Sequence, residues 1–158
     1  MTEKEQKYTT AYQQVKELIA DETDTIANMA NVAALLHEAF GFWWTGFYRV
    51  DANQLVLGPF QGPLACTRIP FGRGVCGTAW QRQATVVVPD VEQFPGHIAC
   101  SSESRSEIVV PMFASSKDCH EITNRQVIAV LDIDSRELNT FDDTDRKWLE
   151  KITALMTE

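Results

Sequence analysis

The chain has 158 residues, of which 44% are hydrophobic and 23% are charged, so it is long enough to bury one substantial core. Its formal net charge of -8 at pH 7 disfavours binding to nucleic acid or to an anionic membrane surface, because both attract basic faces. We therefore expect a single domain over residues 1–158 that binds neither.

The first residues, MTEKEQKYTT, lack the charged-then-apolar pattern of a signal peptide, and no stretch approaches the roughly 20 apolar residues of a membrane span. We therefore expect a cytoplasmic protein. Because that compartment keeps thiols reduced, the 4 cysteines are expected to be free, catalytic or metal-binding rather than a disulfide framework.

Two helices and a hairpin are predicted first along the chain. Apolar residues recur at helical spacing over 8–20 and 24–40, and Gly41 predicts the end of the second helix. Residues 42–50 and 54–60 are rich in aromatic and aliphatic side chains and flank a short turn. That pattern predicts an antiparallel hairpin.

The middle of the chain is expected to hold less regular structure. Glycines in the segment 68–83 precede helix-compatible residues, so we expect a Gly-rich loop that opens a short helix near Val75. Residues 84–88 predict a short buried strand. Residues 89–106 have the composition of a loop, and a loop of that length is usually functional or disordered.

Two strands and a helix are predicted after that loop. Residues 107–113 predict a strand in which Pro111 indicates an edge or a bulge, and 126–135 form the clearest strand. The polar segment 115–125 indicates an exposed connection, and the capping signature Thr140-x-x-Asp143 predicts a final helix. Helices at both ends around hairpin-connected strands predict a mixed α/β (α+β) fold with a central antiparallel sheet.

Carboxylates recur on one face of the strand 126–135. Because side chains alternate along a strand, Asp132 and Asp134 point the same way, roughly 7 Å apart at the backbone. Mutual repulsion then raises one pKa, and a protonated carboxyl is a candidate general acid. The alternative is that the strand leaves the sheet here and the aspartates cap a turn.

Three further residues could join these aspartates. Glu107 begins the strand after the long loop and could bring a third carboxylate to the same end of the sheet, although alone it is typical of a solvated charge. Trp44 and Tyr48 share a face of the first strand and could line a pocket, although aromatic clusters more often belong to a core.

The cysteines offer two candidate nucleophiles. Cys76 lies where the Gly-rich loop meets a helix start, whose dipole lowers a thiol pKa, whereas Cys100 lies in the long loop, open to solvent. Local electrostatics slightly favours Cys76 and leaves the choice open. The alternative for Cys66 and Cys76 is that they are small buried apolar residues, and Cys119 is expected to be a bystander.

A zinc site is the main competing use of the cysteines. Cys66, Cys76, Cys100 and His97 could supply four ligands, but the chain has no C-x₂-C pair, so we expect no metal. Gly72-x-Gly74-x-x-Gly77 matches the dinucleotide fingerprint only superficially, because it lacks a parallel βαβ setting. We therefore expect no cofactor.

Four segments together resemble the free methionine-(R)-sulfoxide reductases, which are single GAF-domain enzymes. They are WTGFY (44–48), LVLGPFQGPLACTRIPFGRGVCGTAW (55–80), GHIACSSESRSEIVVP (96–111) and LDIDS (131–135). The cysteine spacing is highly specific to that family, and the main departure is the longer connection 115–125 with Cys119. The resemblance implies a GAF fold with about six strands and with the N- and C-terminal helices together.

The resemblance also implies a reaction and the roles of individual residues. Cys100 would be the nucleophile, Cys66 the resolving thiol and Cys76 a second redox-active cysteine. Five residues would surround the substrate, with three carboxylates at the sulfoxide and two aromatics at the methylthio end: Glu107, Asp132, Asp134, Trp44 and Tyr48. Free methionine-(R)-sulfoxide would be reduced to methionine through a sulfenic acid and an intramolecular disulfide, which thioredoxin then reduces. The family often forms homodimers, so the resemblance allows one here.

Two non-catalytic alternatives belong to other functional classes. A GAF module could bind a small ligand such as a cyclic nucleotide and signal without turnover, but such modules usually sit beside output domains, for which this chain has no room. A thiol-based oxidant sensor would share the cysteines without needing three carboxylates and an aromatic wall.

Overall fold

The computed structural model describes residues 1–98, 103–115 and 126–158. Within these ranges the chain forms four α-helices and six strands. In chain order the elements are α1 (Glu3–Ile19), α2 (Thr25–Phe40), β1 (Trp44–Asp51), β2 (Gln54–Gln61), β3 (Arg68–Pro70), α3 (Gly74–Arg82), β4 (Val86–Val88), the short 3₁₀-helix η1 (Val91–Gln93), β5 (Ser106–Phe113), β6 (Val127–Ser135) and α4 (Asp143–Met156).

The six strands form one antiparallel sheet in the order β3-β2-β1-β6-β5-β4. β1 and β2 are the predicted hairpin, and β6 lies between β1 and β5 at the centre of the sheet. The predicted mixed α/β fold with a central antiparallel sheet is therefore confirmed.

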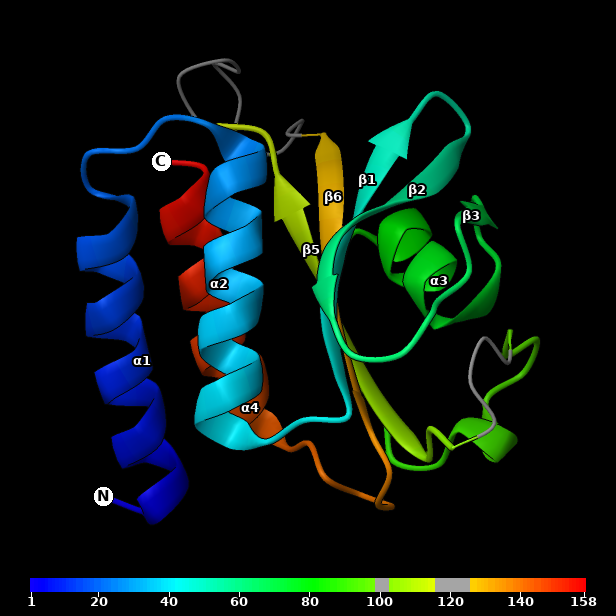
Figure 1. The fold of residues 1–158 in the computed structure, drawn as a ribbon. Coiled ribbons are helices and arrows are strands. Elements are labelled where there is room, and N and C mark those ends of the chain that lie inside the picture. Colours follow the sequence, from blue (N-terminus) through cyan, green and yellow to red (C-terminus); the bar gives the residue numbers. More distant parts are fainter. Residues whose placement is uncertain (99–102, 116–125) are drawn as a thin grey trace.

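Helices cover the two faces of this sheet unequally. Figure 1 shows α1, α2 and α4 on one face and α3 on the other. The N-terminal ends of α1 and α4 meet, where Lys4 Nζ lies 2.8 Å from Asp145 Oδ2 and the Tyr8 hydroxyl donates a 2.5 Å hydrogen bond to Asp145 Oδ1. The terminal helices therefore pack together, as the family resemblance implies.

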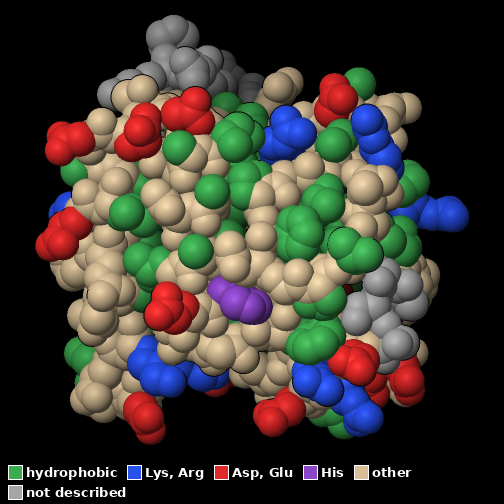
Figure 2. Space-filling view, viewed as in Figure 1, with side chains coloured by type: hydrophobic (Ala, Val, Ile, Leu, Met, Phe, Trp, Pro, Cys, Tyr) green, Lys and Arg blue, Asp and Glu red, His purple; other side chains and the backbone are tan. Residues whose placement is uncertain are grey.

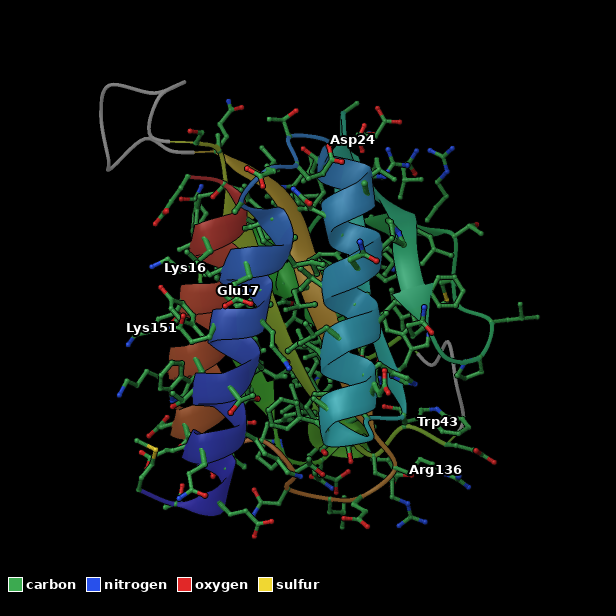
Figure 3. The ribbon with its side chains drawn as sticks, turned by 60° about the vertical axis from the view of Figure 1, so that its left-hand side comes forward. Lys16, Glu17, Asp24, Trp43, Arg136 and Lys151 are labelled. Atoms are coloured by element: carbon green, nitrogen blue, oxygen red, sulfur yellow. The ribbon has the colours of Figure 1, made fainter. Side chains whose placement is uncertain are left out.

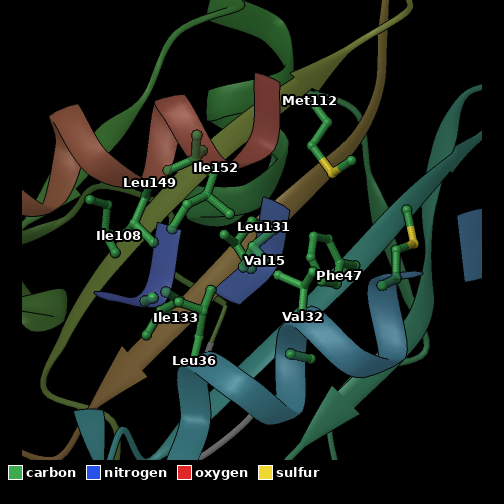
Figure 4. Packing of buried hydrophobic residues seen from close by; sticks show 14 of the residues in the cluster. Val15, Val32, Leu36, Phe47, Ile108, Met112, Leu131, Ile133, Leu149 and Ile152 are labelled. Atoms are coloured by element: carbon green, nitrogen blue, oxygen red, sulfur yellow. The ribbon is translucent and has the colours of Figure 1, made fainter. Parts of the chain in front are cut away.

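The main core fills the space between the sheet and α1, α2 and α4 (Figure 4). Ala129, Leu131 and Ile133 of β6 are completely buried in it, while the opposite face of β6 carries Val130 and Asp132. Each large aliphatic side chain buried in this way contributes roughly 1.5–3 kcal/mol to folding. The predicted alternation along β6 is therefore confirmed, and it leaves the aspartates on the α3 side.

The sequence predicts the end of α2 correctly but misplaces the start of α4. Gly41 ends α2 with φ of +67°, a left-handed conformation that glycine adopts without strain. The final helix is capped by Asp142, which forms a capping box with Asp145, so the predicted Thr140 signature is wrong. The Thr140 hydroxyl instead lies 2.6 Å from the Ser135 hydroxyl, at the end of β6.

The strands also depart from expectation in two places. β3 was not predicted, because its three residues are too short to show a pattern. β5 is an inner strand, but β4 pairs only with Glu107–Val109, so Pro111 lies where β5 has a single neighbour, β6. A register shift follows between Met112 and Phe113. Pro111 therefore occupies an edge-like position within an inner strand.

No helix in the described part of the chain is long and apolar enough to cross a membrane. On the face shown in Figure 2, acidic and basic side chains are interspersed. That face therefore presents no continuous basic surface to a polyanion.

Gly77 allows α3 to approach the turn that precedes it. A Cβ at Gly77 would lie 2.6 Å from the Pro70 carbonyl oxygen and 3.1 Å from the Gly72 nitrogen, both backbone atoms. We therefore expect Gly77→Ala to lower the free energy of unfolding by about 1–3 kcal/mol, although alanine normally stabilises a helix interior. Urea unfolding checks this, with exposed Gln81→Ala on the same helix as the control; a Gly77→Ala protein at least as stable as the wild type would contradict it.

Candidate active site

A pocket opens on the α3 side of the sheet. Strands β1, β3, β5 and β6, helix α3 and the loops that flank them form its walls. Its lining includes all five residues predicted to surround a substrate, together with Cys76 and eight of their neighbours: Trp43, Leu64, Ala65, Ile69, Val75, His97, Ile98 and Ser104. The strand pattern of the sequence therefore brings the predicted carboxylates and aromatics to one place.

Three carboxylates lie together in the wall of this pocket. Glu107 on β5 pairs directly across the sheet with Asp134 on β6, and Asp132 lies two residues away on the same face. Glu107 and Asp132 are each only 6% exposed, and Ser104 donates a 3.1 Å hydrogen bond to Asp134 Oδ1. Both aspartates lie within β6, so the turn-capping alternative is wrong and the predicted third carboxylate is present.

We call Glu107, Asp132 and Asp134 the carboxyl cluster. Burial controls the protonation of all three side chains. Burial, reinforced by the charges of the two aspartates, raises the pKa of Glu107 well above its ordinary value of 4.5. Burial and the Asp132 charge likewise raise the pKa of Asp134 well above its ordinary range. Burial also raises the pKa of Asp132, although hydrogen bonds with Glu107 and Cys76 lower it in part. The cluster therefore retains protons above the usual carboxylate range.

A raised carboxyl pKa has a defined effect on stability. The folded cluster binds protons that the unfolded chain releases near pH 4, so its contribution to stability is full below that pH and is lost as pH rises toward the folded pKa values. Glu107→Gln mimics the protonated form, so it should gain stability relative to the wild type as pH rises from 4 to 8. The gain should be about 1.4 kcal/mol for each unit by which the pKa is raised.

Urea unfolding of both proteins across that pH range measures this difference, with exposed Glu92→Gln as the control. A difference that is independent of pH, or that falls as pH rises, would contradict the raised pKa of Glu107.

The described cysteines differ in state. Cys76 is a buried free thiol in the first turn of α3, and burial together with the negative charge of the carboxyl cluster raises its pKa well above the ordinary value. The prediction that the helix dipole lowers this pKa is therefore wrong, because desolvation and three carboxylates outweigh the dipole. Cys66 is disulfide-bonded. Cys100 and Cys119 lie outside the described residues.

Aromatic rings form one wall of the pocket. Trp44 and Tyr48 have their ring centroids 5.9 Å apart, and Phe60 stacks on Trp44 at 5.2 Å. The Trp44 indole donates a 3.0 Å hydrogen bond to the Pro63 carbonyl, and the Tyr48 hydroxyl donates one of 2.8 Å to the Cys66 carbonyl. The polar tips of both rings therefore hold the loop that carries Cys66.

Comparison with known proteins places this chain in a family. The GAF domain model matches residues 19–157. The chain is 54% identical to "GAF domain-containing protein A" of Dictyostelium discoideum (97% of this chain, 92% of that protein) and 46% identical to "Free methionine-R-sulfoxide reductase" of Escherichia coli (87% and 78%). The free methionine-R-sulfoxide reductase of Neisseria meningitidis, solved in complex with its substrate, superposes with a TM-score of 0.91 at 52% identity (99% of this chain, 90% of that chain). The chain belongs to the free methionine-R-sulfoxide reductase family of GAF domains.

Family membership confirms the resemblance and the GAF fold inferred from sequence. In this member of the reductase family, two residues that the sequence analysis does not single out lie in or beside the pocket.

Gly46 lies beside the pocket, behind the Trp44 ring. It lies across the sheet from Asp132, and a Cβ there would come within 2.6 Å of the Trp44 indole. A glycine inside a strand often marks such a close approach, so the signal was present in the sequence. Trp43 lines the pocket itself, and Figure 3 shows it beside Arg136, whose guanidinium lies 4.5 Å from the ring centroid. No local sequence pattern predicts this contact between Trp43 and Arg136.

Cys76, Glu107 and Asp132 come nearest to a metal-binding set among the described residues, with one ligand atom from each lying within 4.8 Å of the others. Metals bind the deprotonated forms of these groups, whereas the raised pKa values favour the protonated forms. The donor chemistry therefore fits proton transfer better than metal binding.

Proposed function

We propose that this protein reduces free L-methionine-(R)-S-oxide to L-methionine. The observation that carries the proposal is the buried carboxyl cluster, which retains protons beside an aromatic wall and a disulfide-forming cysteine. Relatives named for this activity, and a substrate complex of the Neisseria meningitidis enzyme, support the same assignment.

The reaction explains why protonated carboxyls are needed. A sulfoxide oxygen leaves poorly until it is protonated, so a buried carboxyl with a raised pKa supplies the proton while a thiolate attacks the sulfur. The attacking cysteine takes the oxygen as a sulfenic acid, and the substrate sulfur gains two electrons and leaves as the thioether of methionine. A second thiol then condenses with the sulfenic acid to a disulfide and releases water.

Among the cysteines, we propose Cys100 as the nucleophile, Cys66 as the resolving thiol and Cys76 as a second redox-active cysteine. The disulfide at Cys66 supports a resolving role. The raised pKa of Cys76 argues against its attacking first, because the thiolate is the nucleophile.

Thioredoxin is the proposed reductant of the disulfide, and the cytoplasm is the proposed location, because the cycle requires a compartment that keeps thiols reduced.

For the substrate, we propose that Trp44 and Tyr48 contact the methylthio end while the carboxyl cluster faces the sulfoxide oxygen. The two rings line the pocket with their polar atoms already engaged by backbone carbonyls, so their apolar surfaces remain for the substrate.

A non-catalytic GAF module or a thiol oxidant sensor remains the alternative function. Neither gains anything from three buried carboxyls, whose burial destabilises the folded protein at neutral pH.

Methionine formation with dithiothreitol as reductant tests the proposal. The purified protein is given free L-methionine-(R)-sulfoxide or the same sulfoxide blocked as an N-acetyl amide. Because α3, four strands and the loops that flank them surround the pocket, we expect turnover of the free amino acid and little of the bulkier blocked one. Absence of turnover with the free amino acid would refute the function, and equal turnover of both would refute the specificity.

A further inference from the structure

His97 lies at the edge of the carboxyl cluster, and its Nε2 atom is 3.9 Å from Glu107 Oε1. The loop around it holds its position. The backbone N–H of His97 donates a 3.2 Å hydrogen bond to the Phe94 carbonyl, and the next residue, Ile98, lies against Gly74 at the start of α3. His97 itself lines the pocket, with 18% of its side chain exposed.

The proposed reaction leaves a buried negative charge on Glu107 that a hydrogen-bond donor would stabilise. A proton that leaves Glu107 for the sulfoxide oxygen leaves a carboxylate in a buried site beside Asp132 and Asp134. An uncompensated buried charge is costly, and the cost would slow the transfer. A nearby N–H donor would lower that cost as the charge develops.

The described lining of the pocket offers few such donors. The Tyr48 hydroxyl and the Trp44 indole donate to backbone carbonyls, and the Ser104 hydroxyl donates to Asp134. His97 is the one described lining residue with an imidazole, and its contact within the cluster is with Glu107. Burial lowers the pKa of His97, so the donor is the N–H of the neutral ring.

We propose that His97 is a positioning residue that donates from Nε2 to Glu107 as this carboxyl, the acid of the reaction, gives its proton to the sulfoxide. The inference rests on the proposed function and deepens it by naming the acid. As the proton moves to the sulfoxide oxygen, the thiolate of the attacking cysteine bonds to the substrate sulfur. The 3.9 Å separation shortens to a hydrogen bond when Glu107 becomes charged, because catalytic hydrogen bonds often tighten only in the reacting complex.

The test compares His97→Phe, which removes the donor, with His97→Gln, which keeps an N–H donor. The measured quantity is the rate of methionine formation in a single turnover of pre-reduced protein, without external reductant. Loss of a hydrogen bond to a developing charge should slow His97→Phe about 10- to 100-fold, with little change in the half-saturating substrate concentration. His97→Gln should stay within a few-fold of the wild type.

The pH–rate profile adds a second readout. The groups that face Glu107 and His97 in the pocket are Asp132 and Asp134 of β6, Cys76 of α3 and Tyr48 of β1. Because the donor stabilises the carboxylate form of Glu107, its removal should move the alkaline limb of the profile to higher pH in His97→Phe. His97→Gln should keep the limb near its wild-type position.

His37→Phe is the matched control, since this histidine is also partly buried but lies on the other face of the sheet, with Nδ1 3.1 Å from Thr45 Oγ1. It should leave the single-turnover rate unchanged. An unchanged rate in His97→Phe, an effect on half-saturation alone, or a His97→Gln protein as slow as His97→Phe would each overturn the inference. A wild-type protein inactive on the R sulfoxide would instead refute the proposed function.

Discussion

Cys100→Ser is expected to reduce methionine formation to background, the largest effect of any substitution proposed for this protein. A serine hydroxyl at neutral pH is a far weaker nucleophile than a thiolate, and it cannot carry the oxygen away as a sulfenic acid.

Cys66→Ser is expected to affect the second step of the reaction and not the first. Attack does not require the resolving thiol, so this variant should release about one methionine per active site and then stop for lack of a disulfide. Quantifying methionine per mole of pre-reduced protein distinguishes the two results.

Cys119→Ser is the matched control for both cysteine substitutions, because the sequence gives this cysteine no role. Cys76→Ser should retain the release of methionine, because burial and the carboxyl cluster raise the pKa of the Cys76 thiol and disfavour its thiolate. Full activity in Cys100→Ser, or a complete loss confined to Cys76→Ser, would contradict the proposed division of roles.

Asp132→Asn is expected to lower the turnover of methionine sulfoxide at pH 7.5 by about 100-fold or more, within the range attributed to general acid catalysis. The charge of Asp132 helps to raise the pKa of Glu107, so its removal lets Glu107 lose its proton at neutral pH. Asp132 Oδ1 is also buried without a hydrogen-bond partner in the described part of the chain, which leaves it available to the protonated substrate oxygen. Because a lower pH restores the proton on Glu107, the defect should shrink as pH falls.

Exposed Asp51→Asn, at the other end of the sheet, is the control for charge loss alone, and it should leave turnover unchanged. The same pair of variants separates an enzyme from an oxidant sensor. Peroxide-driven disulfide formation should survive in Asp132→Asn, since that oxidation needs no acid from the cluster. Unchanged sulfoxide turnover in Asp132→Asn would favour the sensor.

The layout of the sheet and its site could be predicted where local pattern and tertiary structure agree. Alternation along β6 places Asp132 and Asp134 on one face because one face of that strand must meet the helix-covered core. The family resemblance then joined Glu107, Trp44 and Tyr48 to the same pocket, and the structure places them there.

Other features depend on contacts between distant segments, which a local pattern does not encode. The low pKa expected for Cys76 followed from its helix position, but the carboxylates that reverse it come from β5 and β6. The sequence indicates His97 only as a possible zinc ligand, because its approach to Glu107 depends on how the long loop returns to the sheet. The capping box of α4 was misplaced by two residues, because Thr140 is held by the end of β6.

The most direct test of the central claim is a thioredoxin-coupled assay of the separate R and S epimers of free methionine sulfoxide. A chiral pocket with its acid on one wall and aromatic rings on another presents the oxygen of only one epimer to the carboxyl cluster. We predict steady consumption of reductant and formation of methionine with the R epimer, and neither with the S epimer. Absence of activity with the R epimer, or equal rates with both, would contradict the account.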